Sequence, residues 1–334
     1  MKQRTIAING FGRIGRTALK VALEQPGLTI VAINDLADNE MLAHLLRHDT
    51  AYGAYDKEVT AGADHLVVGG TKIHAFAEKD PEQLPWGKLG VDVVLECTGI
   101  FREKEEAAAH IRAGAKRVVI SAPAKGDDPV SMHVIGVNAD AGIDGEVVSN
   151  ASCTTNCISP VMRVLSEAFG VEKSLMTTIH SYTSDQRLQD APHKDLRRAR
   201  AAAQNIIPTS TGAAKATAKT LPELEGIFDG MAFRVPTITV SLSDITCLLK
   251  RDATVEEVND AFRTAAEDDR YHGVLAVTDE ELVSSDFIGN PHSAIIDLPL
   301  TKVIGGNLVK VIAWYDNEWG YATRLVELAE TLRI

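Results

Sequence analysis

The chain has 334 residues, of which 45% are hydrophobic, and its 34 basic and 46 acidic side chains give a formal net charge of −12. This composition is typical of a folded protein, and the length predicts two domains at roughly 150 residues per domain. The acidic balance argues against a nucleic-acid partner, because nucleic-acid-binding domains are usually basic. No run reaches 18 apolar residues, so we expect no membrane-spanning helix and no membrane partner.

The four cysteines are too few for a disulfide scaffold, and the N-terminal residues lack the pattern of a signal peptide. We therefore expect a cytoplasmic protein whose cysteines stay reduced.

The first part of the chain alternates short β-rich runs with helical stretches, which is the pattern of βαβ units around a parallel sheet. We expect strands at residues 5–8, 28–33, 91–95 and 118–120, and helices at residues 13–24, 39–48 and 103–113. After about residue 150 the β-rich segments become longer, at residues 175–182, 231–249, 294–296 and 309–315. The predicted fold class is α/β, with a parallel-sheet domain followed by an α+β domain that has a large, mostly antiparallel sheet.

Two further helices are predicted in the second part. Thr254 and Glu257 have the spacing of a capping box for a helix that runs to about Ala266. Residues 319–332 have the apolar spacing of an amphipathic helix.

A glycine-rich motif lies between the first predicted strand and the first predicted helix. Gly10-Phe11-Gly12-Arg13-Ile14-Gly15 matches G-x-G-x-x-G, and Asp35 follows the next strand 20 residues later. A tight turn alone would explain the glycines, but the full context is that of a Rossmann dinucleotide site. There the glycines let the backbone approach a pyrophosphate at the helix N-terminus, and the acidic residue binds the ribose hydroxyls. An acidic residue also repels a 2′-phosphate, which favours NAD over NADP.

Cys153 is the candidate nucleophile, because Ser152 is a plausible N-cap and Cys153 would lie in the first helical turn. At that position the helix dipole and free N–H groups are expected to lower the pKa of the thiol. His180 ends a β-run and is a candidate base, although a histidine satisfied within its strand explains it equally well. A packing role is expected for the other cysteines, Cys97, Cys157 and Cys247. We predict no metal site, because a Cys-x-x-x-Cys pair alone binds metal poorly.

Five long motifs, at residues 7–16, 151–157, 192–200, 209–215 and 314–321, span the chain. Through them the sequence closely resembles the phosphorylating glyceraldehyde-3-phosphate dehydrogenases. The resemblance implies a Rossmann NAD-binding domain at residues 1–150, onto which the C-terminal helix at 317–334 packs, and a catalytic domain at 151–316. It also implies a homotetramer in which a loop from Tyr182 to about Gln204 faces a neighbouring subunit's cofactor.

The resemblance further implies the role of each site residue in converting D-glyceraldehyde 3-phosphate, phosphate and NAD to 1,3-bisphosphoglycerate and NADH through a cysteine thioester. Cys153 is then the nucleophile and His180 the base. The residues that bind the substrate phosphate and inorganic phosphate are Ser152, Thr154, Thr183, Arg198, Thr211, Gly212 and Arg234. Beyond the glycine motif and Asp35, the cofactor contacts are Lys79, Ser121 and Asn317.

Cofactor selectivity receives conflicting signals from the family pattern. Leu36 beside Asp35 is the pairing of NAD-dependent members, whereas Ala191 occurs in members that accept both cofactors. Lys79 stands where many members have arginine, and Ser184 where many have asparagine. We expect NAD as the main cofactor and weak use of NADP.

Two alternative functions remain open. Erythrose-4-phosphate dehydrogenases have the same cysteine–histidine pair but lack the threonine at Thr183 and the Thr-Gly pair, both of which this chain keeps. The second alternative is a catalytically idle nucleotide-binding interaction protein, which the intact Cys153 and His180 do not support.

Overall fold

The computed structural model describes residues 3–128, 130–139 and 143–334. These residues form two compact units. The first comprises the described residues of Met1–His133, Ala139–Ala151 and Ala322–Ile334, and the second comprises Val134–Asn138 and Ser152–Tyr321. The final helix, α9 (Trp319–Thr331), therefore contributes most of its length to the first unit. None of the helices in the described ranges is long and apolar enough to cross a membrane.

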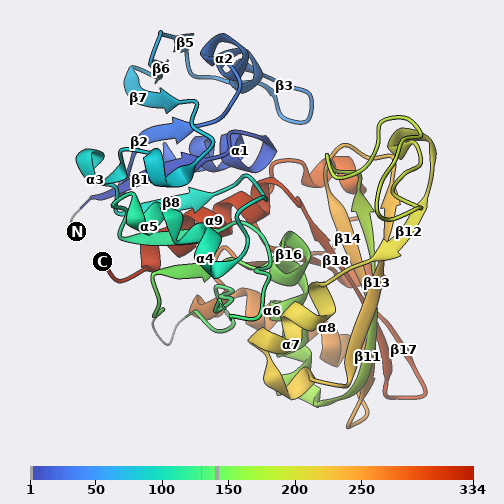
Figure 1. The fold of residues 1–334 in the computed structure, drawn as a ribbon. Helices are drawn as coiled ribbons and strands as arrows, with labels where there is room; N and C mark the ends of the chain where they lie inside the picture. The colour runs from blue at the N-terminus through green and yellow to red at the C-terminus, as the bar shows by residue number, and fades with distance from the viewer. Residues whose placement is uncertain (1–2, 129, 140–142) are drawn as a thin grey trace. The chain divides into compact units, whose positions relative to one another are not determined.

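The first unit is built on an eight-stranded sheet in the order β10-β9-β8-β1-β2-β7-β6-β5 (Figure 1). Its strands are β1 (Arg4–Asn9), β2 (Leu28–Asn34), β5 (Val59–Ala61), β6 (His65–Val68), β7 (Thr71–Phe76), β8 (Val93–Glu96), β9 (Arg117–Ile120) and β10 (Val147–Ser149). The six from β10 to β7 are parallel, and β5 and β6 are antiparallel additions. A separate two-stranded sheet pairs β3 (His48–Asp49) with β4 (Gly53–Ala54).

Strand β1 lies where the strand order reverses, with β2 on one side and β8 on the other. In open parallel sheets, ligands bind beyond the carboxyl ends of the strands at such a reversal. Residues 6–8 of β1 and 93–95 of β8 are at most 1% exposed, so both strands are buried on both faces. This burial explains the continuous apolar runs in the sequence.

The helices of the first unit largely follow the predicted ranges. They are α1 (Arg13–Ala22), α2 (Asn39–Arg47), α3 (Trp86–Leu89), α4 (Lys104–Ala107) and α5 (Ala109–Arg112), with a 3₁₀ turn η1 (Pro81–Gln83). The single helix predicted at 103–113 is divided into α4 and α5. Ala108, at φ −63° and ψ −13°, ends one helix and begins the next, and its ψ is closer to that of a 3₁₀ turn than to that of an α-helix.

The second unit is built on a sheet in the order β12-β13-β11-β14-β18-β16-β15, with β17 paired to β18. Its strands are β11 (Val171–Ser181), β12 (Ile207–Ser210), β13 (Phe228–Val235), β14 (Ser241–Leu249), β15 (Leu275–Thr278), β16 (Ala294–Asp297), β17 (Lys302–Ile304) and β18 (Leu308–Tyr315). Only the β11–β13 and β15–β16 pairs are parallel among the pairings of this sheet in the described residues. The predicted fold class, a Rossmann unit plus an α+β unit with a mostly antiparallel sheet, is confirmed.

The β-rich segment predicted at 231–249 holds two strands, since it contains the end of β13 and the whole of β14. Pro236 follows β13 and has no N–H group to donate to a neighbouring strand. Val240, just before β14, has φ +68°, which is incompatible with a continuous strand.

Helices cover one face of this second sheet. They are α6 (Cys153–Phe169), α7 (Ala213–Thr220) and α8 (Val255–Ala266) (Figure 1). The unit also has short 3₁₀ turns, which are η2 (Ala202–Gln204), η3 (Pro222–Leu224), η4 (Asp269–Tyr271), η5 (Ser284–Phe287) and η6 (Leu298–Leu300). The predicted capping box at the start of α8 is confirmed, with Thr254 and Glu257 bonding each other's backbone N–H groups.

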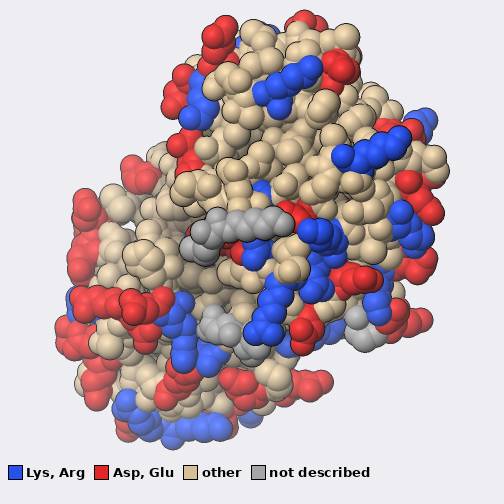
Figure 2. All heavy atoms as spheres, turned by 90° about the vertical axis from the view of Figure 1, so that its left-hand side faces the viewer, with Lys and Arg blue, Asp and Glu red and all other residues tan. Residues whose placement is uncertain are grey.

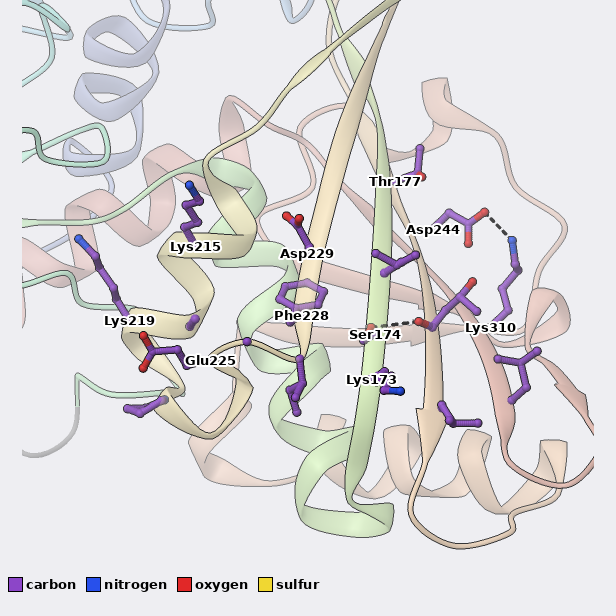
Figure 3. A pocket seen from close by; sticks show the side chains of 18 residues that line it. Lys173, Ser174, Thr177, Lys215, Lys219, Glu225, Phe228, Asp229, Asp244 and Lys310 are labelled. Carbon is purple, nitrogen blue, oxygen red and sulfur yellow. Dashed lines mark hydrogen bonds and ion pairs between the residues drawn. The ribbon is translucent and has the colours of Figure 1, made fainter.

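The opposite face of the sheet is open. Along β14 buried residues alternate with half-buried ones, as expected for a strand with one covered face. A hollow of about 1360 Å³ lies between α7 and the strands β11, β13, β14 and β18, with Lys215 and Lys219 on the α7 side and the paired Asp244 and Lys310 on the other (Figure 3).

Charges of both signs are interspersed on the molecular face drawn in Figure 2.

Candidate active site

Cys153 is the first residue of α6, and the local sequence explains why the helix begins there. Ser152 is extended, and its Oγ accepts a hydrogen bond from the Thr155 N–H at 3.1 Å, so the predicted N-cap is confirmed. The expectation of a lowered thiol pKa is not confirmed. Burial raises the pKa of the Cys153 thiol, and this effect exceeds the opposing ones of Arg234 and the Thr154 hydroxyl. Burial depends on the surrounding fold, whereas the helix position is local.

His180, next to the end of β11, is the side chain that faces the thiol. Its Nε2 lies 3.5 Å from the Cys153 Sγ, and its Nδ1 lies 2.7 Å from the backbone oxygen of Ser181. The Arg234 Nη1 lies 3.2 Å from the same Nδ1 but donates to the Ser181 oxygen at 3.1 Å. Because a carbonyl oxygen can only accept, we assign the ring proton to Nδ1, which leaves the lone pair of Nε2 facing the thiol. Burial and the positive charge of Arg234 lower the pKa of His180 to about 3, which keeps the imidazole neutral at physiological pH.

Arg234 is placed beside His180 by strand register, because β11 and β13 pair in parallel with His180 opposite Arg234. Its Nη1 donates to the Ser181 oxygen at 3.1 Å and to the Thr183 Oγ1 at 3.4 Å. Its Nε is buried and has no partner among the described residues. A buried, charged donor without an acceptor is costly, so this N–H is suited to an anionic ligand.

Arg198 and the start of α7 form a second group of donors. Arg198 donates through Nε to the Thr209 Oγ1 at 2.9 Å and through Nη2 to the Ser210 oxygen at 3.1 Å, and it also pairs with Asp185. The next residues, Thr211 and Gly212, precede α7, and Gly212 is its N-cap without a side-chain cap. A helix N-terminus of this kind offers backbone N–H groups to a phosphate.

The Thr154 hydroxyl is hydrogen-bonded by Tyr315, a residue that sequence reasoning did not select. The Tyr315 hydroxyl lies 3.0 Å from the Thr154 Oγ1 and 2.8 Å from the Thr178 Oγ1. Thr178 itself donates to the Leu242 oxygen, so Tyr315 donates to Thr178 and accepts from Thr154. The Tyr315 ring also packs edge-on against His180. Tyr315 lies within a recognised motif, but its contacts depend on β18 pairing with β14 in the folded sheet.

Asn317 lies just beyond β18 and its side chain has a fixed orientation. Its Oδ1 accepts from the Ser181 Oγ at 2.9 Å and from the Ser241 Oγ at 2.8 Å. With the oxygen held by two hydroxyls, its Nδ2 is the group left to donate to a ligand.

The first-unit candidates gather at one edge of the parallel sheet. Gly10 follows β1, Asp35 follows β2, Lys79 follows β7 after two residues and Ser121 follows β9. Because the carboxyl ends of parallel strands meet at one edge, these residues share the edge at which ligands bind in such sheets.

The glycine motif fits a pyrophosphate group on geometric grounds. Gly10 has φ +90°, and a Cβ there would lie 2.6 Å from the Thr98 nitrogen. A Cβ on Gly15 would lie 2.0 Å from the Gly10 oxygen, whereas one on Gly12 would meet open space. Helix α1 then begins at Arg13 without a side-chain cap, which leaves backbone donors facing that space. The Asp35 Oδ2 accepts from the Phe11 N–H at 2.7 Å, which places its carboxylate beside the turn.

The remaining cysteines are consistent with packing roles. Cys157 and Cys247 are buried, and burial raises the pKa of the Cys247 thiol to about 11. Burial also raises the pKa values of the Cys97 and Cys157 thiols. Within the described ranges, no group of three or more His, Cys, Asp or Glu side chains could hold a metal ion.

Comparisons with known proteins give a consistent assignment. Residues 4–104 match the family Glyceraldehyde 3-phosphate dehydrogenase, NAD binding domain, and residues 152–317 match the family Glyceraldehyde 3-phosphate dehydrogenase, C-terminal domain. The chain is 54% identical over 327 residues to the glyceraldehyde-3-phosphate dehydrogenase of Geobacillus stearothermophilus, covering 97% of this chain and 96% of that protein. It is 53% identical to the glyceraldehyde-3-phosphate dehydrogenase 1 of Bacillus subtilis, covering 97% and 96%, and to the Zymomonas mobilis enzyme, covering 97% of each. With both domains matched and more than half of its residues shared with these relatives, the chain belongs to the glyceraldehyde-3-phosphate dehydrogenase family.

Proposed function

We propose that this chain oxidises D-glyceraldehyde 3-phosphate with NAD and inorganic phosphate, yielding 1,3-bisphosphoglycerate and NADH. The observation that carries the proposal is the contact between the Cys153 Sγ and the unprotonated Nε2 of His180 at 3.5 Å, with Nδ1 fixed by the Ser181 oxygen. This arrangement gives a thiol a base that can take its proton without any rotation of the ring.

In the proposed first step the Cys153 sulfur attacks the aldehyde carbon after its proton passes to the His180 Nε2. The imidazolium returns that proton to the new alkoxide oxygen, which gives a hemithioacetal hydroxyl and a neutral His180. His180 then removes the hydroxyl proton as the carbon loses hydride, leaving a thioester. General acid–base help of this kind contributes about 10²–10⁴-fold to a rate. NAD, when bound, accepts the hydride.

In the second step an oxygen of inorganic phosphate attacks the thioester carbonyl, and the C–S bond breaks to release the acyl phosphate and the thiolate. The imidazolium form of His180 stabilises the oxyanion of the tetrahedral intermediate. The thiolate then recovers a proton, which restores the neutral pair.

Two anions must be bound, and the donors form two groups that suit them. We assign the substrate phosphate to Thr183 and Arg234, whose Nε–H lacks a protein acceptor. We assign inorganic phosphate to Ser152, Thr154, Thr211 and Gly212, with Arg198 near both sites. The Ser152 and Thr154 hydroxyls are already engaged by Thr155 and Tyr315, so these two residues contribute mainly backbone N–H groups. The Asn317 amide is assigned to the carboxamide of the nicotinamide.

We propose that the glycine motif, Asp35, Lys79 and Ser121 hold the rest of the dinucleotide. The position of Asp35 over the motif supports NAD as the main cofactor, with weak use of NADP.

We also propose a homotetramer that acts in the cytoplasm, with the open face of the second sheet as one contact between subunits. Large apolar side chains on this face are exposed, and Leu175 is 67% and Met231 is 42% exposed. Contiguous exposed apolar surface of this kind commonly marks an interface. The four cysteines are all free, which suits a reducing compartment. Light scattering should give four times the chain mass, and a monomer would contradict this assignment.

Initial-rate assays test the catalytic proposal. We expect turnover of glyceraldehyde 3-phosphate with NAD and phosphate, and much slower turnover of erythrose 4-phosphate. Without phosphate, about one NADH per active site should form in a burst, followed by slow hydrolysis of the thioester. A steady rate that is indifferent to phosphate would overturn the proposal, and a preference for erythrose 4-phosphate would support the sister activity.

A further inference from the structure

The proposed mechanism leaves unused a buried cluster of hydrogen-bonded side chains around Glu96 and His110 in the first unit. Glu96 is the last residue of β8, and His110 lies on α5; their side chains are 1% and 0% exposed. Acidic side chains are almost never fully buried unless their hydrogen-bonding groups are satisfied. The partners of this carboxylate therefore show what it holds in place.

The hydrogen-bond donors around the pair allow only one arrangement of protons. The Trp86 Nε1–H donates to the His110 Nδ1 at 3.0 Å, so Nδ1 accepts and the ring proton lies on Nε2. That Nε2–H donates to the Glu96 Oε2 at 3.0 Å. The Asn9 Nδ2 donates to the same oxygen at 2.6 Å.

The other oxygen of Glu96 shapes the loop after β8. Its Oε1 accepts from the Thr98 N–H at 2.8 Å and also from the Thr98 hydroxyl. The Thr98 Oγ1 in turn accepts from the Ile100 N–H at 3.0 Å. One carboxylate thus fixes both the last side chain of β1 and the backbone that follows β8.

The chain of bonds continues across the sheet through two asparagines. The Asn34 Nδ2 at the end of β2 donates to the Asn9 Oδ1 at 2.7 Å. The Asn34 side chain also bonds both the N–H and the oxygen of Glu78, which follows β7, at 2.8 and 2.9 Å. Buried side chains therefore link the carboxyl ends of β8, β1 and β2 to the segment after β7.

Three of the segments that this chain of bonds fixes are followed immediately by a candidate dinucleotide contact. Asn9 precedes Gly10, Asn34 precedes Asp35 and Glu78 precedes Lys79. The crevice at the strand reversal lies between β1 and β8, which Glu96 joins directly.

We propose that Glu96 and His110 are positioning residues for the dinucleotide, which set the backbone of the glycine turn and of the 97–100 loop before NAD binds. The inference rests on the proposed NAD-dependent function. Preorganisation of this kind lowers the cost of ordering a site on binding, so its loss should appear in NAD affinity.

The test variant is Glu96→Gln, which keeps the size of the side chain but turns an amide NH₂ group toward the Asn9 and His110 donors. We expect its dissociation constant for NAD, measured by calorimetry on the cofactor-free protein, to rise about tenfold. The KM for NAD should rise in parallel, while the KM for the aldehyde stays within twofold of wild type.

Asp92→Asn is the matched control, because Asp92 links the same two strands at their opposite ends. Asp92 accepts from the Thr5 N–H at 3.0 Å and from the Lys116 Nζ at 2.6 Å. We expect this variant to lose thermal stability but to bind NAD within twofold of wild type. Equal losses of affinity in both variants would show a merely structural role and overturn the inference.

His110→Leu provides a second route if Glu96→Gln does not fold, since it removes one donor to Glu96 and should also weaken NAD binding severalfold. A folded variant of either residue with wild-type affinity would overturn the inference. Failure of the wild-type protein to bind NAD would instead overturn the proposed function.

Discussion

In the protein without ligand, the reactivity of Cys153 toward an alkylating agent should rise about tenfold per pH unit across the neutral range. The pKa of His180 is lowered to about 3, and that of the Cys153 thiol is raised above its ordinary value of 9.0. Because the thiol holds its proton far more tightly than the imidazole 3.5 Å away, the proton of the pair lies on the sulfur, and thiolate–imidazolium pairs have a population of only about 10⁻⁶. Thiolate beside a neutral imidazole is the more abundant ionised form at neutral pH, and its population follows the solvent pH.

His180→Gln removes the internal base and makes the thiol an isolated one. The ionised fraction of a thiol with a pKa of 9.0 or higher is about 10⁻³ or less at pH 6 and about a hundredfold larger at pH 8. Iodoacetamide should therefore modify both the variant and the wild type about 100 times faster at pH 8 than at pH 6, because a neutral imidazole of such low pKa does not hold the thiol proton in the protein without ligand.

The assay is the rate of carbamidomethylation of Cys153, followed by peptide mass at several pH values. His292→Gln serves as the control, because His292 lies in the same unit but bonds to Asn290. A wild-type rate that is independent of pH, and that becomes pH-dependent in His180→Gln, would refute this reasoning and show a preformed thiolate–imidazolium pair. A plateau that survives His180→Gln would show that another group accepts the proton.

Three further predictions concern single residues. Cys153→Ser should reduce hydride transfer to below a few per cent of wild type while NAD affinity stays within about twofold, because a serine hydroxyl is far less nucleophilic; stopped-flow rates and calorimetry check this. Tyr315→Phe should lower the free energy of unfolding by about 1–2 kcal/mol in urea titrations, since it leaves the Thr154 and Thr178 hydroxyls without their shared partner; an unchanged midpoint would contradict that network. Asp35→Ala should narrow the preference for NAD over NADP, because like charges about 4 Å apart cost about 1–4 kcal/mol, or roughly ten- to several-hundred-fold in affinity. Wild-type use of both cofactors within twofold would show that Asp35 does not face the 2′ position.

Local patterns in the sequence predicted the features that depend on neighbouring residues. The Ser152 N-cap, the Thr254 capping box and the turn at Gly10 each depend on backbone within a few residues, and the structure has all three. The division of the 231–249 segment into two strands is also local in origin, since Pro236 interrupts it.

Features that depend on strand pairing could not be predicted in the same way. His180 is identified only through a resemblance, because it lies 27 positions from Cys153 along the chain and His133 and His193 lie at comparable distances. Its contact with Arg234 follows from the register of β11 and β13, strands whose pairing no periodicity specifies. The direction of the thiol pKa was predicted incorrectly for the same reason, since the burial that raises it is a property of the assembled unit.

The position of Arg234 connects substrate binding to the state of the Cys153–His180 pair. In the protein without ligand, the Arg234 charge helps to lower the pKa of His180 and disfavours protonation of the ring. A substrate phosphate bound at the Arg234 Nε would offset that charge, and the proton affinity of the imidazole would rise as a result. The thiol proton would then pass to His180 more readily once a phosphorylated aldehyde is in place. An unphosphorylated aldehyde would not produce this change, so the same arginine would favour phosphorylated substrates in the chemical step as well as in binding.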